Sequence, residues 1–490
     1  MEGILNKTWM LLILALAGCK DKDGVDTSDP TSPGDDACSA VEASAADTVK
    51  TAITFSWMTD TEGTATVEYG LDGALDLSLA SETSGTDHSV TVPLLRSGQT
   101  YSWRGTVQTT AGDTITCDTQ EVTIAPQPQG ILGFNLNISD PERSAVANGY
   151  VLFTTLQAEA SFVGMIDGTA SYVFFQDPSQ EDPLMGSVGA HPGLDGRSIV
   201  WNVYDRDRNV DVGGIRRVDI RGGDITATRT LNAHHDFVEI SEGEFGWLAY
   251  NFRENVDVAG TPPTIAASIC TDGSCPVASD MIYEGSEGMS DETASTEVMS
   301  LLDTITPTWV CEHAEDYDGF VPEYFNLTHA NSLIYEESED VYFMMSRHLD
   351  AIFKVERATG DVLWQLGGEG SDFTAIGELF DHGHYSHHWP GGFLVFDNGD
   401  HRSPPVSRVA EYSYDEQAMT VELVWEMEEP TGSFIAVLGD ARRLSNGNTL
   451  IDWSSKGRIQ EVTPDKEVVW EAEATIGGLV SRVRFIENFQ

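Results

Sequence analysis

EDVYF at residues 339–343 is a turn that leads into a short apolar strand, and this unit recurs along most of the chain. The other copies are NGYVL (148–152), GRSIV (196–200), GEFGW (243–247), GGFLV (391–395) and NGNTL (446–450). Several units close with a strand that ends in tryptophan, at residues 361–364, 421–425 and 467–470. Repeats of about fifty residues with short strands and a late aromatic residue are typical of β-propeller blades. The pattern therefore predicts an all-β fold in which residues 130–490 form a six-bladed β-propeller.

The spacing of the copies is regular except in the middle of the chain. The first three copies are 47 residues apart and the last three are 52 and 55 apart, whereas 97 residues separate Gly243 from Asp340. An unseen blade or an insertion would account for the long interval. We favour an insertion, because residues 284–315 are acidic and alternate poorly between apolar and polar. The last strand, at residues 479–486, is expected to return and close the ring.

The segment before the propeller reads as a smaller β domain. Short apolar strands at residues 52–57, 65–69, 89–92 and 100–106 are separated by Gly, Asp and Ser. Trp57, followed by VEYG (67–70) and GQTY (98–101), resembles a fibronectin type III β-sandwich. We assign residues 38–125 to this sandwich, with a linker at 126–130, and expect no chemistry in it.

The N-terminus resembles a bacterial lipoprotein signal. Lys7 precedes an apolar run at residues 9–16, which is too short to span a bilayer and ends in LAGC (16–19). By this resemblance residues 1–18 are a signal peptide and Cys19 is the lipidated residue, followed by a lipid-anchored acidic linker to residue 37. Triacylation would supply a stable membrane anchor. The expected location is the cell envelope, on the periplasmic side or in the outer membrane.

Five cysteines remain after Cys19. Disulfides are allowed in an oxidising envelope, so Cys38 could pair with Cys117, and Cys270 with Cys275. Cys311 is then left over. No cysteine lies in a CxxC or Cys/His zinc spacing, and we expect no metal and no cofactor.

The charge balance restricts the partners. The chain has 27 basic and 79 acidic residues, a formal net charge of -52. Nucleic acids and anionic lipid surfaces need basic partners, so neither is expected to bind. An anionic small molecule would need a locally positive pocket. The sequence does not indicate the oligomeric state.

Hairpin geometry brings several polar residues together. The turn near Ser338 is equally distant from His329 and Arg347, so an antiparallel hairpin places these two as neighbours. His235, in the pair His234–His235, and His384 hold the equivalent position before the turns of their own units. The inner strands of a propeller line its central channel, so these side chains should meet at the channel mouth.

These residue types suit sulfuryl transfer. A guanidinium and imidazoles can hold three sulfuryl oxygens through charge-assisted hydrogen bonds. A neutral imidazole is a competent nucleophile near neutral pH, and a second histidine can protonate a phenolate leaving group. We expect activity to fall as the pH drops through the ordinary imidazole pKa of about 6.5.

Several strings around these residues resemble the PAPS-independent arylsulfotransferase family. They are HANSL (329–333), SRH (346–348), TGDVLWQLGG (359–368), FDNGDHR (396–402), SRV (407–409) and EY (411–412), with His384 ahead of the last three. The resemblance extends from about Gly149 to the C-terminus and is dense from His329 to Trp470. It implies an enzyme that moves a sulfuryl group from a phenolic sulfate ester to a phenol acceptor through a sulfohistidine.

The resemblance also implies roles for individual residues. His384 would be the nucleophile, and His329, Arg347 and His235 would complete the catalytic set. His234, Asn331 and Asn398 would contact the substrate. Gly383 stands where the family usually has glutamine, and His382, His387 and His388 crowd the same segment. His382 therefore remains an alternative nucleophile.

Two other hypotheses remain open. The chain could be a non-catalytic β-propeller lipoprotein that binds a ligand or a protein at the cell envelope, because propellers serve many functions. The histidines of residues 382–388 could instead chelate a transition metal. We rank chelation below catalysis because no carboxylate or cysteine ligand lies at a familiar spacing.

Overall fold

The computed structural model describes residues 38–156, 161–180, 185–205, 213–258, 269–271, 274–306, 311, 313 and 323–489. The expected signal peptide, the linker and Cys19 lie outside the described residues. Within the described part the fold is all-β, and no helix there has the length and apolar composition needed to cross a bilayer. Short helical turns complete the inventory: η1 (Val146–Asn148), η2 (Pro178–Gln180), η4 (Glu292–Ala294), α2 (Leu301–Thr304) and η6 (Ser454–Lys456).

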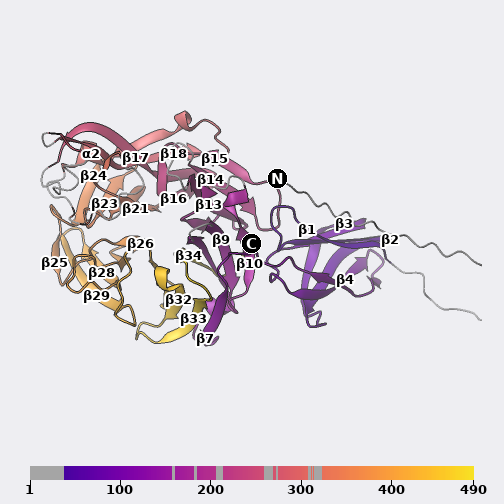
Figure 1. The fold of residues 1–490 in the computed structure, drawn as a ribbon. Helices are drawn as coiled ribbons and strands as arrows, with labels where there is room; N and C mark the ends of the chain where they lie inside the picture. The colour runs from indigo at the N-terminus through magenta and orange to yellow at the C-terminus, as the bar shows by residue number, and fades with distance from the viewer. Residues whose placement is uncertain are drawn as a thin grey trace, which may run out of the picture.

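The N-terminal strands form one six-stranded sheet that lies beside the larger body (Figure 1). They are β1 (Ser39–Ala45), β2 (Ile53–Leu71), β3 (Leu77–Val92), β4 (Thr100–Thr109), β5 (Thr114–Thr116) and β6 (Gln120–Thr123). The separate strands expected at residues 52–57 and 65–69 are wrong, because β2 runs through both with an irregular register between Met58 and Gly63. The first part of β2 pairs with β1, whereas its second part pairs with β4. The two parts enclose a common core that includes Phe55, Trp103 and Val107.

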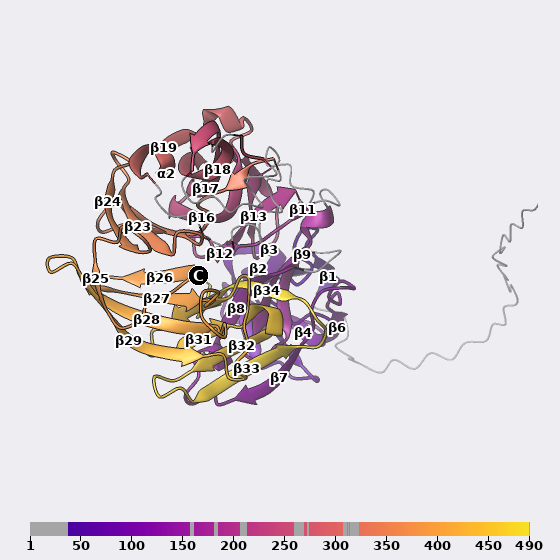
Figure 2. The same ribbon diagram turned by 60° about the vertical axis from the view of Figure 1, so that its left-hand side comes forward.

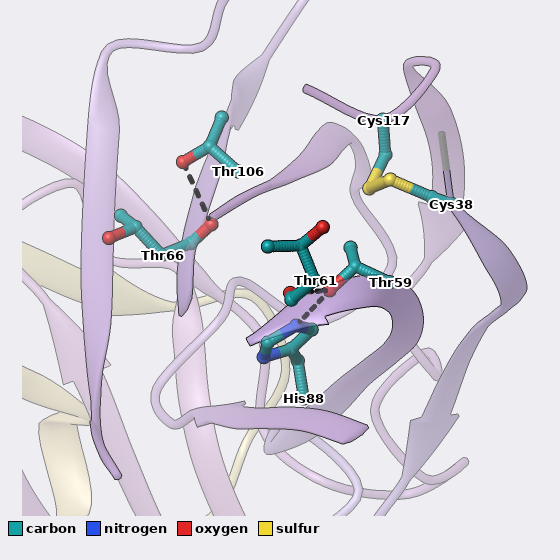
Figure 3. Close-up of a disulfide and its surroundings, with 7 residues drawn as sticks. All are labelled: Cys38, Thr59, Thr61, Thr66, His88, Thr106 and Cys117. Carbon is teal, nitrogen blue, oxygen red and sulfur yellow. Dashed lines mark hydrogen bonds between the residues drawn. A yellow bond between two sulfur atoms is a disulfide. The ribbon is translucent and has the colours of Figure 1, made fainter. Parts of the chain in front are cut away.

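Both expected disulfides are confirmed. Cys38 and Cys117 join the two ends of the N-terminal sheet (Figure 3), and Cys270 and Cys275 close a short loop. Close to the first disulfide, the His88 ring is buried and lies 2.8 Å from the hydroxyl of Thr59 (Figure 3).

Six further sheets of four or five strands are present among the described residues, and they follow one another around a ring (Figure 2). The first sheet contains β8 (Tyr150–Leu156), β9 (Ser161–Asp167), β10 (Tyr172–Gln176) and β34 (Leu479–Ile486). The second contains β11 (Met185–Gly186), β12 (Ala190–Pro192), β13 (Ser198–Asp205), β14 (Gly214–Asp219) and β15 (Thr226–Arg229). The third contains β16 (Ala233–Ser241), β17 (Glu244–Asp257), β18 (Ser274–Ser286), β19 (Thr296–Ser300) and β20 (Phe325–Asn326). The fourth sheet contains β21 (Ala330–Glu336), β22 (Val341–Ser346), β23 (Ala351–Glu356) and β24 (Val362–Gly367). The fifth contains β25 (Thr374–Ile376), β26 (His384–Trp389), β27 (Gly392–Asp397), β28 (Arg408–Asp415) and β29 (Thr420–Glu428). The sixth contains β30 (Asp440–Arg443), β31 (Thr449–Asp452), β32 (Arg458–Val462), β33 (Val468–Ala474) and β7 (Phe134–Ser139).

The two ends of this region close the ring. The last strand, β34, pairs antiparallel with β8 of the first sheet, as expected, and the early strand β7 pairs with β33 of the sixth. Both ends of this region are thus held by hydrogen bonds as edge strands of the first and sixth sheets.

The long interval between the third and fourth copies is occupied by the third sheet itself. The strands β17, β18 and β19 all belong to the same sheet as β16, so no separate sheet is described between the third and the fourth. The placement of the insertion at residues 284–315 is wrong in part, because Thr296–Ser300 form the outer strand β19 paired with β18. An outer strand is half exposed, which explains its weak apolar alternation.

Apolar clusters seal each junction between neighbouring sheets. Val151 and Trp470 join the first and sixth sheets, and Phe343 and Phe393 join the fourth and fifth. Corresponding clusters fill the other junctions, and one of them also takes in Val49 of the N-terminal region. Burial of these faces is the main force that stacks the sheets side by side.

Candidate active site

The innermost strands of the six sheets surround the centre of the ring. Neighbouring elements in contact are β12 with β34, β34 with β30, β30 with β26, β26 with β21, and β21 with β16. The sequence-predicted histidines and Asn331 lie on β16, β21 and β26 or directly before them, whereas Arg347 and Asn398 follow the second strands β22 and β27. Residues far apart in the sequence therefore meet because the inner strands and their hairpin partners come together at the centre.

Four of these inner strands are interrupted by a bulge or irregular register at the site. The interruptions lie in β16, β21, β26 and β34, between Ala233 and Phe237, Ala330 and Ser332, His384 and Ser386, and Ser481 and Arg484. Non-glycine residues at or next to them adopt a left-handed backbone: His235 (φ 45°), His329 (φ 48°), Tyr385 (φ 43°) and Arg482 (φ 52°). A bulge turns side chains out of the regular alternation, at a backbone cost of about 1–3 kcal/mol per strained residue.

The expected pairing of His329 with Arg347 is confirmed. Ala330 pairs with Ser346 across the hairpin, and the backbone N–H of Arg347 donates to the His329 carbonyl at 3.0 Å. The Arg347 side chain is fully buried, and its Nη2 donates to Asp400 Oδ2 at 3.0 Å and to the Ala436 carbonyl at 3.4 Å. A guanidinium is thus held beside His329 with its charge partly compensated by one carboxylate.

The histidines converge on this guanidinium. The rings of His235 and His329 are 4.8 Å apart. Burial, followed by the charge of Arg347, lowers the pKa of His384 to about 3, although Asn398, Asp400 and the backbone of His382 oppose the shift. Burial and the neighbouring histidines likewise hold the pKa values of His235 and His329 well below the usual range. These shifts favour neutral imidazoles around a cationic arginine at neutral pH, and they place the titration of His384 below the pH of 6.5 assumed from the sequence.

Asn398 determines which nitrogen of His384 carries the proton. The Asn398 Nδ2 donates to the carbonyls of Ile435 and Leu438, which orients its Oδ1 toward His384 Nδ1 at 2.7 Å. An amide oxygen only accepts, so Nδ1 is the protonated nitrogen of the neutral ring. The lone pair of His384 is consequently on Nε2. Asn398 thus contacts the nucleophile candidate, and its expected contact with the substrate stays a prediction.

Asn331 and Gly383 position the same strand. The Asn331 side chain is fully buried and donates to the Gly383 carbonyl at 2.9 Å, which ties β21 to the start of β26. A Cβ at residue 383 would lie 3.0 Å from Val395 Cγ2 and 3.1 Å from Met345 Sδ. This close packing accounts for glycine at a position where the resembled family usually has glutamine.

The other histidines of residues 382–388 point elsewhere. His382 places Nδ1 2.6 Å from Asp400 and Nε2 2.7 Å from the sulfur of Cys311, so both of its ring nitrogens are engaged. His387 accepts a hydrogen bond from the Arg443 backbone, and His388 stacks on Phe343 at 4.2 Å between ring centroids. The histidines of this segment therefore do not form a common chelate.

His234 and His235 form a relay rather than two equivalent ligands. Their Nδ1 atoms are 2.9 Å apart, while His234 Nε2 lies 3.1 Å from Asp280 and its ring stacks on Tyr250. One of these two Nδ1 atoms donates and the other accepts, so a single proton lies between the two rings. His235 is the member of the pair that lies against His329, and His234 lies behind it.

Three buried residues that sequence reasoning missed hold the inner strands together. Asp280 accepts from the Thr328 hydroxyl and from the Ala330 backbone at 2.7 Å, which links the third sheet to the residues around His329. Asp236 accepts from the Leu333 backbone at 2.8 Å and from Arg482 of the closing strand. Asp236 directly follows the two histidines, which was a usable signal, whereas no spacing pointed to Asp280 or Arg482.

Fold and site together define a class of protein. The chain is an all-β, propeller-like protein in which neutral histidines and an arginine from different sheets meet at the centre. A family model for arylsulfotransferases, described as Arylsulfotransferase (ASST), matches residues 200–478, more than half of the chain. The protein belongs to the arylsulfotransferase family, which makes it a sulfotransferase enzyme.

Solved structures similar to the chain are distant. A nidogen/laminin complex shares 8% identity over 69% of this chain and 99% of its own, with a TM-score of 0.39. A putative 6-phosphogluconolactonase from Bacteroides uniformis ATCC 8492 shares 13% over 69% and 99%, with a TM-score of 0.37. The β-propeller domain of Cps50 (Swd1) from Myceliophteria thermophila shares 9% over 72% and 89%, with a TM-score of 0.36. No curated protein matches the chain at a significant level.

Proposed function

We propose that the protein is a PAPS-independent aryl-sulfate sulfotransferase that moves a sulfuryl group from a phenolic sulfate ester to a phenol through a sulfohistidine at His384. The observation that carries the proposal is the state of His384: a buried, neutral ring with its lone pair on Nε2, beside the charge of Arg347. A neutral imidazole near a buried guanidinium combines a nucleophile with a site for sulfuryl oxygens.

In the first half-reaction Nε2 of His384 attacks sulfur. The N–S bond forms as the S–O bond to the aryl group breaks, and its electron pair leaves on the aryl oxygen. In the second half-reaction the oxygen of an acceptor phenol attacks sulfur, the N–S bond breaks and the imidazole is restored. Arg347 and His329 would hold the sulfuryl oxygens throughout, so the protein mainly positions the group and stabilises its charge.

His235 is suited to move the proton. The negative charge of a bound donor would oppose the charge of Arg482, which contributes to the low pKa of His235, and so favour the protonated form of His235. His235 would give this proton to the leaving phenolate and take a proton back from the acceptor phenol. His234 Nδ1 lies 2.9 Å from His235 Nδ1 and would hold the His235 ring in place during this cycle.

Buried arginines would allow this strongly acidic chain to bind an anionic substrate. The chain carries a formal charge of -52, which repels a sulfate ester at long range. Arg347, Arg442 and Arg482 are buried on the inner strands or beside them. Each is paired with an aspartate (Asp400, Asp440 and Asp236), so these guanidiniums would hold the sulfuryl oxygens through short-range hydrogen bonds, which the long-range repulsion, screened by salt, opposes only weakly.

The finer architecture and the location belong to the same proposal. The six sheets are interpreted as the blades of a six-bladed propeller, and residues 38–125 as a fibronectin type III-like β-sandwich. Cys19 would anchor the protein to the membrane, and the enzyme would act on small phenolic substrates in the cell envelope.

The test follows colour release from p-nitrophenyl sulfate with and without added phenol. We expect phenol-dependent turnover in the wild-type protein and its loss in His384→Asn, because the nitrogen that forms the covalent bond is gone. His387→Asn, on the same strand but outside the pocket, is the matched control and should keep turnover. With donor alone, mass spectrometry should find one sulfuryl group on the peptide that contains His384.

Four outcomes would contradict parts of the proposal. Label on His382 would move the nucleophile by two residues. Release without phenol would indicate hydrolysis rather than transfer. Phenol-dependent turnover that persists in His384→Asn and His382→Asn would remove the histidine mechanism, and turnover absent from a folded wild type would favour the non-catalytic binding protein.

A further inference from the structure

A second cluster of reactive side chains lies directly behind the sulfuryl site. Cys311 and His382 are buried and His401 is partly buried, and the three come from separate parts of the chain. The Cys311 sulfur is 2.7 Å from His382 Nε2 and 3.7 Å from His401 Nε2, and the three atoms lie within 4.8 Å of one another. A free thiol and two imidazole nitrogens thus converge on one point.

Asp400 orients His382 for this cluster. Its Oδ2 lies 2.6 Å from His382 Nδ1, and because a carboxylate accepts, the proton is on Nδ1. The Nε2 lone pair therefore faces the Cys311 sulfur. A histidine that donates from one nitrogen to a carboxylate while the other faces a common centre is the usual arrangement around protein-bound metal ions.

Two further groups surround the same point. The His313 backbone donates to the Cys311 sulfur at 3.3 Å, and the His313 ring lies 5.2 Å from that of His401. Asp350 Oδ2 lies 3.7 Å from His401 Nε2. Either side chain is close enough to add a fourth ligand after a small movement.

We propose that Cys311 Sγ, His382 Nε2 and His401 Nε2 bind one divalent transition-metal ion of the zinc class. Sulfur and imidazole nitrogen are the ligands that such ions prefer, in tetrahedral geometry with bonds of about 2.3 Å to sulfur and about 2.0 Å to nitrogen. These bonds place sulfur and nitrogen ligands about 3.5 Å apart. The Cys311–His401 distance of 3.7 Å already matches. The shorter Cys311–His382 contact is an S–H···N hydrogen bond, and it opens when the thiol loses its proton to solvent and the metal takes its place.

The same residues suggest a competing role. Cys311, His382 and Asp400 stand in the order of a thiol nucleophile, base and orienting carboxylate. A thiol nucleophile with its base and orienting carboxylate has no use for a second imidazole, whereas His401 Nε2 lies 3.7 Å from the same sulfur. The extra ligand therefore favours a metal.

The metal would position the sulfuryl site. Asp400 contacts both His382 and Arg347, so an ion on His382 holds the carboxylate that orients the guanidinium. It would also join residue 311, in the connection between β19 and β20 of the third sheet, to residues 382 and 401 of the fifth sheet region. This reverses the sequence-based expectation of no metal, which considered only ligands close together in the sequence.

The full-length protein tests the proposal without any activity assay. We expect one zinc equivalent per chain by elemental analysis after equilibration with zinc and desalting. After chelator treatment, added cobalt(II) should give a sulfur-to-cobalt charge-transfer band. Cys311→Ser should lose the charge-transfer band, and both Cys311→Ser and His401→Ala should lose the zinc equivalent. The matched control His88→Gln, in the N-terminal sheet, should keep both signals.

A second measurement covers variants that fold poorly. Zinc should raise the Tm of chelator-treated wild-type protein, because an ion that binds only the folded state stabilises it, and should slow alkylation of Cys311. His384→Asn should bind zinc like the wild type, so this result does not depend on the sulfotransferase proposal. Absence of a zinc equivalent, of the cobalt band and of any zinc effect on Tm or alkylation in wild-type protein would overturn the metal site.

Discussion

His384 shows how a common residue type acquires a particular state from its surroundings. In water a histidine titrates near neutral pH, but here burial and then the charge of Arg347 lower its pKa to about 3. The ring is therefore a free base across the physiological range. Asn398 adds the second requirement, because it holds the proton on Nδ1 and exposes the lone pair of Nε2.

The depressed pKa predicts the acid limb of the pH profile. A lowered pKa means that the nucleophile is lost only as the pH falls through about 3, so the burst of p-nitrophenol in single-turnover experiments should be no slower at pH 5 than at pH 8. A cation at the neighbouring cysteine–histidine cluster would lower the pKa further and leave the sign unchanged. A burst rate that falls tenfold per pH unit below about 6.5 would show that His384 titrates as in water.

Arg347→Lys separates the contribution of the planar guanidinium shape to catalysis from the contribution of its positive charge. Arg347→Lys keeps one positive charge but loses the planar fork that contacts Asp400 and Ala436. We expect kcat to fall by about 10- to 100-fold, with some activity left, because one preorganised donor is lost while the charge remains. Steady-state kinetics with p-nitrophenyl sulfate measure this. The control is Arg357→Lys. Arg357 forms an ion pair with Glu284 at the sheet edge, so its replacement should leave kcat unchanged.

At the scale of the strands, the site depends on bulges and on buried aspartates that connect neighbouring sheets. The bulges of β16, β21, β26 and β34 turn side chains toward the centre, where regular alternation would have hidden some of them. Asp236 then joins three of these strands through the Leu333 backbone and Arg482. Arg482 itself lies over the Tyr385 ring, 3.7 Å from its centroid.

Asp236→Asn should be strongly destabilising. Burial opposes ionisation of this carboxyl, yet Arg482 and His191 hold its pKa well below the usual range, so the folded protein contains the charged pair. Removing one charge leaves Arg482 buried and unpaired, at a cost of about 3–5 kcal/mol in the free energy of unfolding. Denaturant titration by circular dichroism measures the loss.

The control and the pH dependence make this prediction specific. Asp219→Asn removes a carboxylate from an exposed pair with Arg197 and should cost less than about 1 kcal/mol. Because the folded pKa of Asp236 is depressed, its stabilisation is present above the unfolded value of about 3.9 and is lost as the pH falls below it. Equal losses in both variants would show that the buried pair contributes no more than a surface one.

At the scale of the whole molecule, the protein is a ring of stacked sheets with a smaller sheet docked on it. Apolar clusters fill every junction between neighbouring sheets, and Val49 and Ala52 of the N-terminal region belong to the cluster between the first and second sheets. Arg96 also donates to Asp167 of the first sheet at 2.6 Å. The N-terminal region is therefore packed against the ring rather than tethered loosely.

The two disulfides should contribute unequally to stability. Cys38 and Cys117 are 79 residues apart, whereas Cys270 and Cys275 are 5 apart. Loop-closure entropy predicts a loss of about 4 kcal/mol on removing the first and about 2 kcal/mol on removing the second. Calorimetry should show a larger fall in the unfolding temperature for the double Cys→Ser variant at residues 38 and 117 than for the one at residues 270 and 275. A larger shift for the 270/275 variant would contradict the entropic account.

The sequence by itself determined the local structure and whatever follows from it. The turn-and-strand repeats predict all-β sheets and a closing strand at residues 479–486, which pairs with β8. Symmetry about Ser338 predicts the neighbours His329 and Arg347, because the register of a hairpin is set by its own turn. The cysteine pairs were predictable from position, because Cys38 and Cys117 bracket the N-terminal region and Cys270 and Cys275 are only 5 residues apart.

Only the tertiary structure decided which residues from different sheets meet. No spacing in the sequence brings Asp280 to Thr328, Arg482 to Asp236, or Cys311 and His401 to His382. These contacts depend on closure of the ring and on bulges that break the two-residue alternation. The pKa of His384 was likewise inaccessible, because it depends on burial and on the distance to Arg347, which exist only once the inner strands have come together.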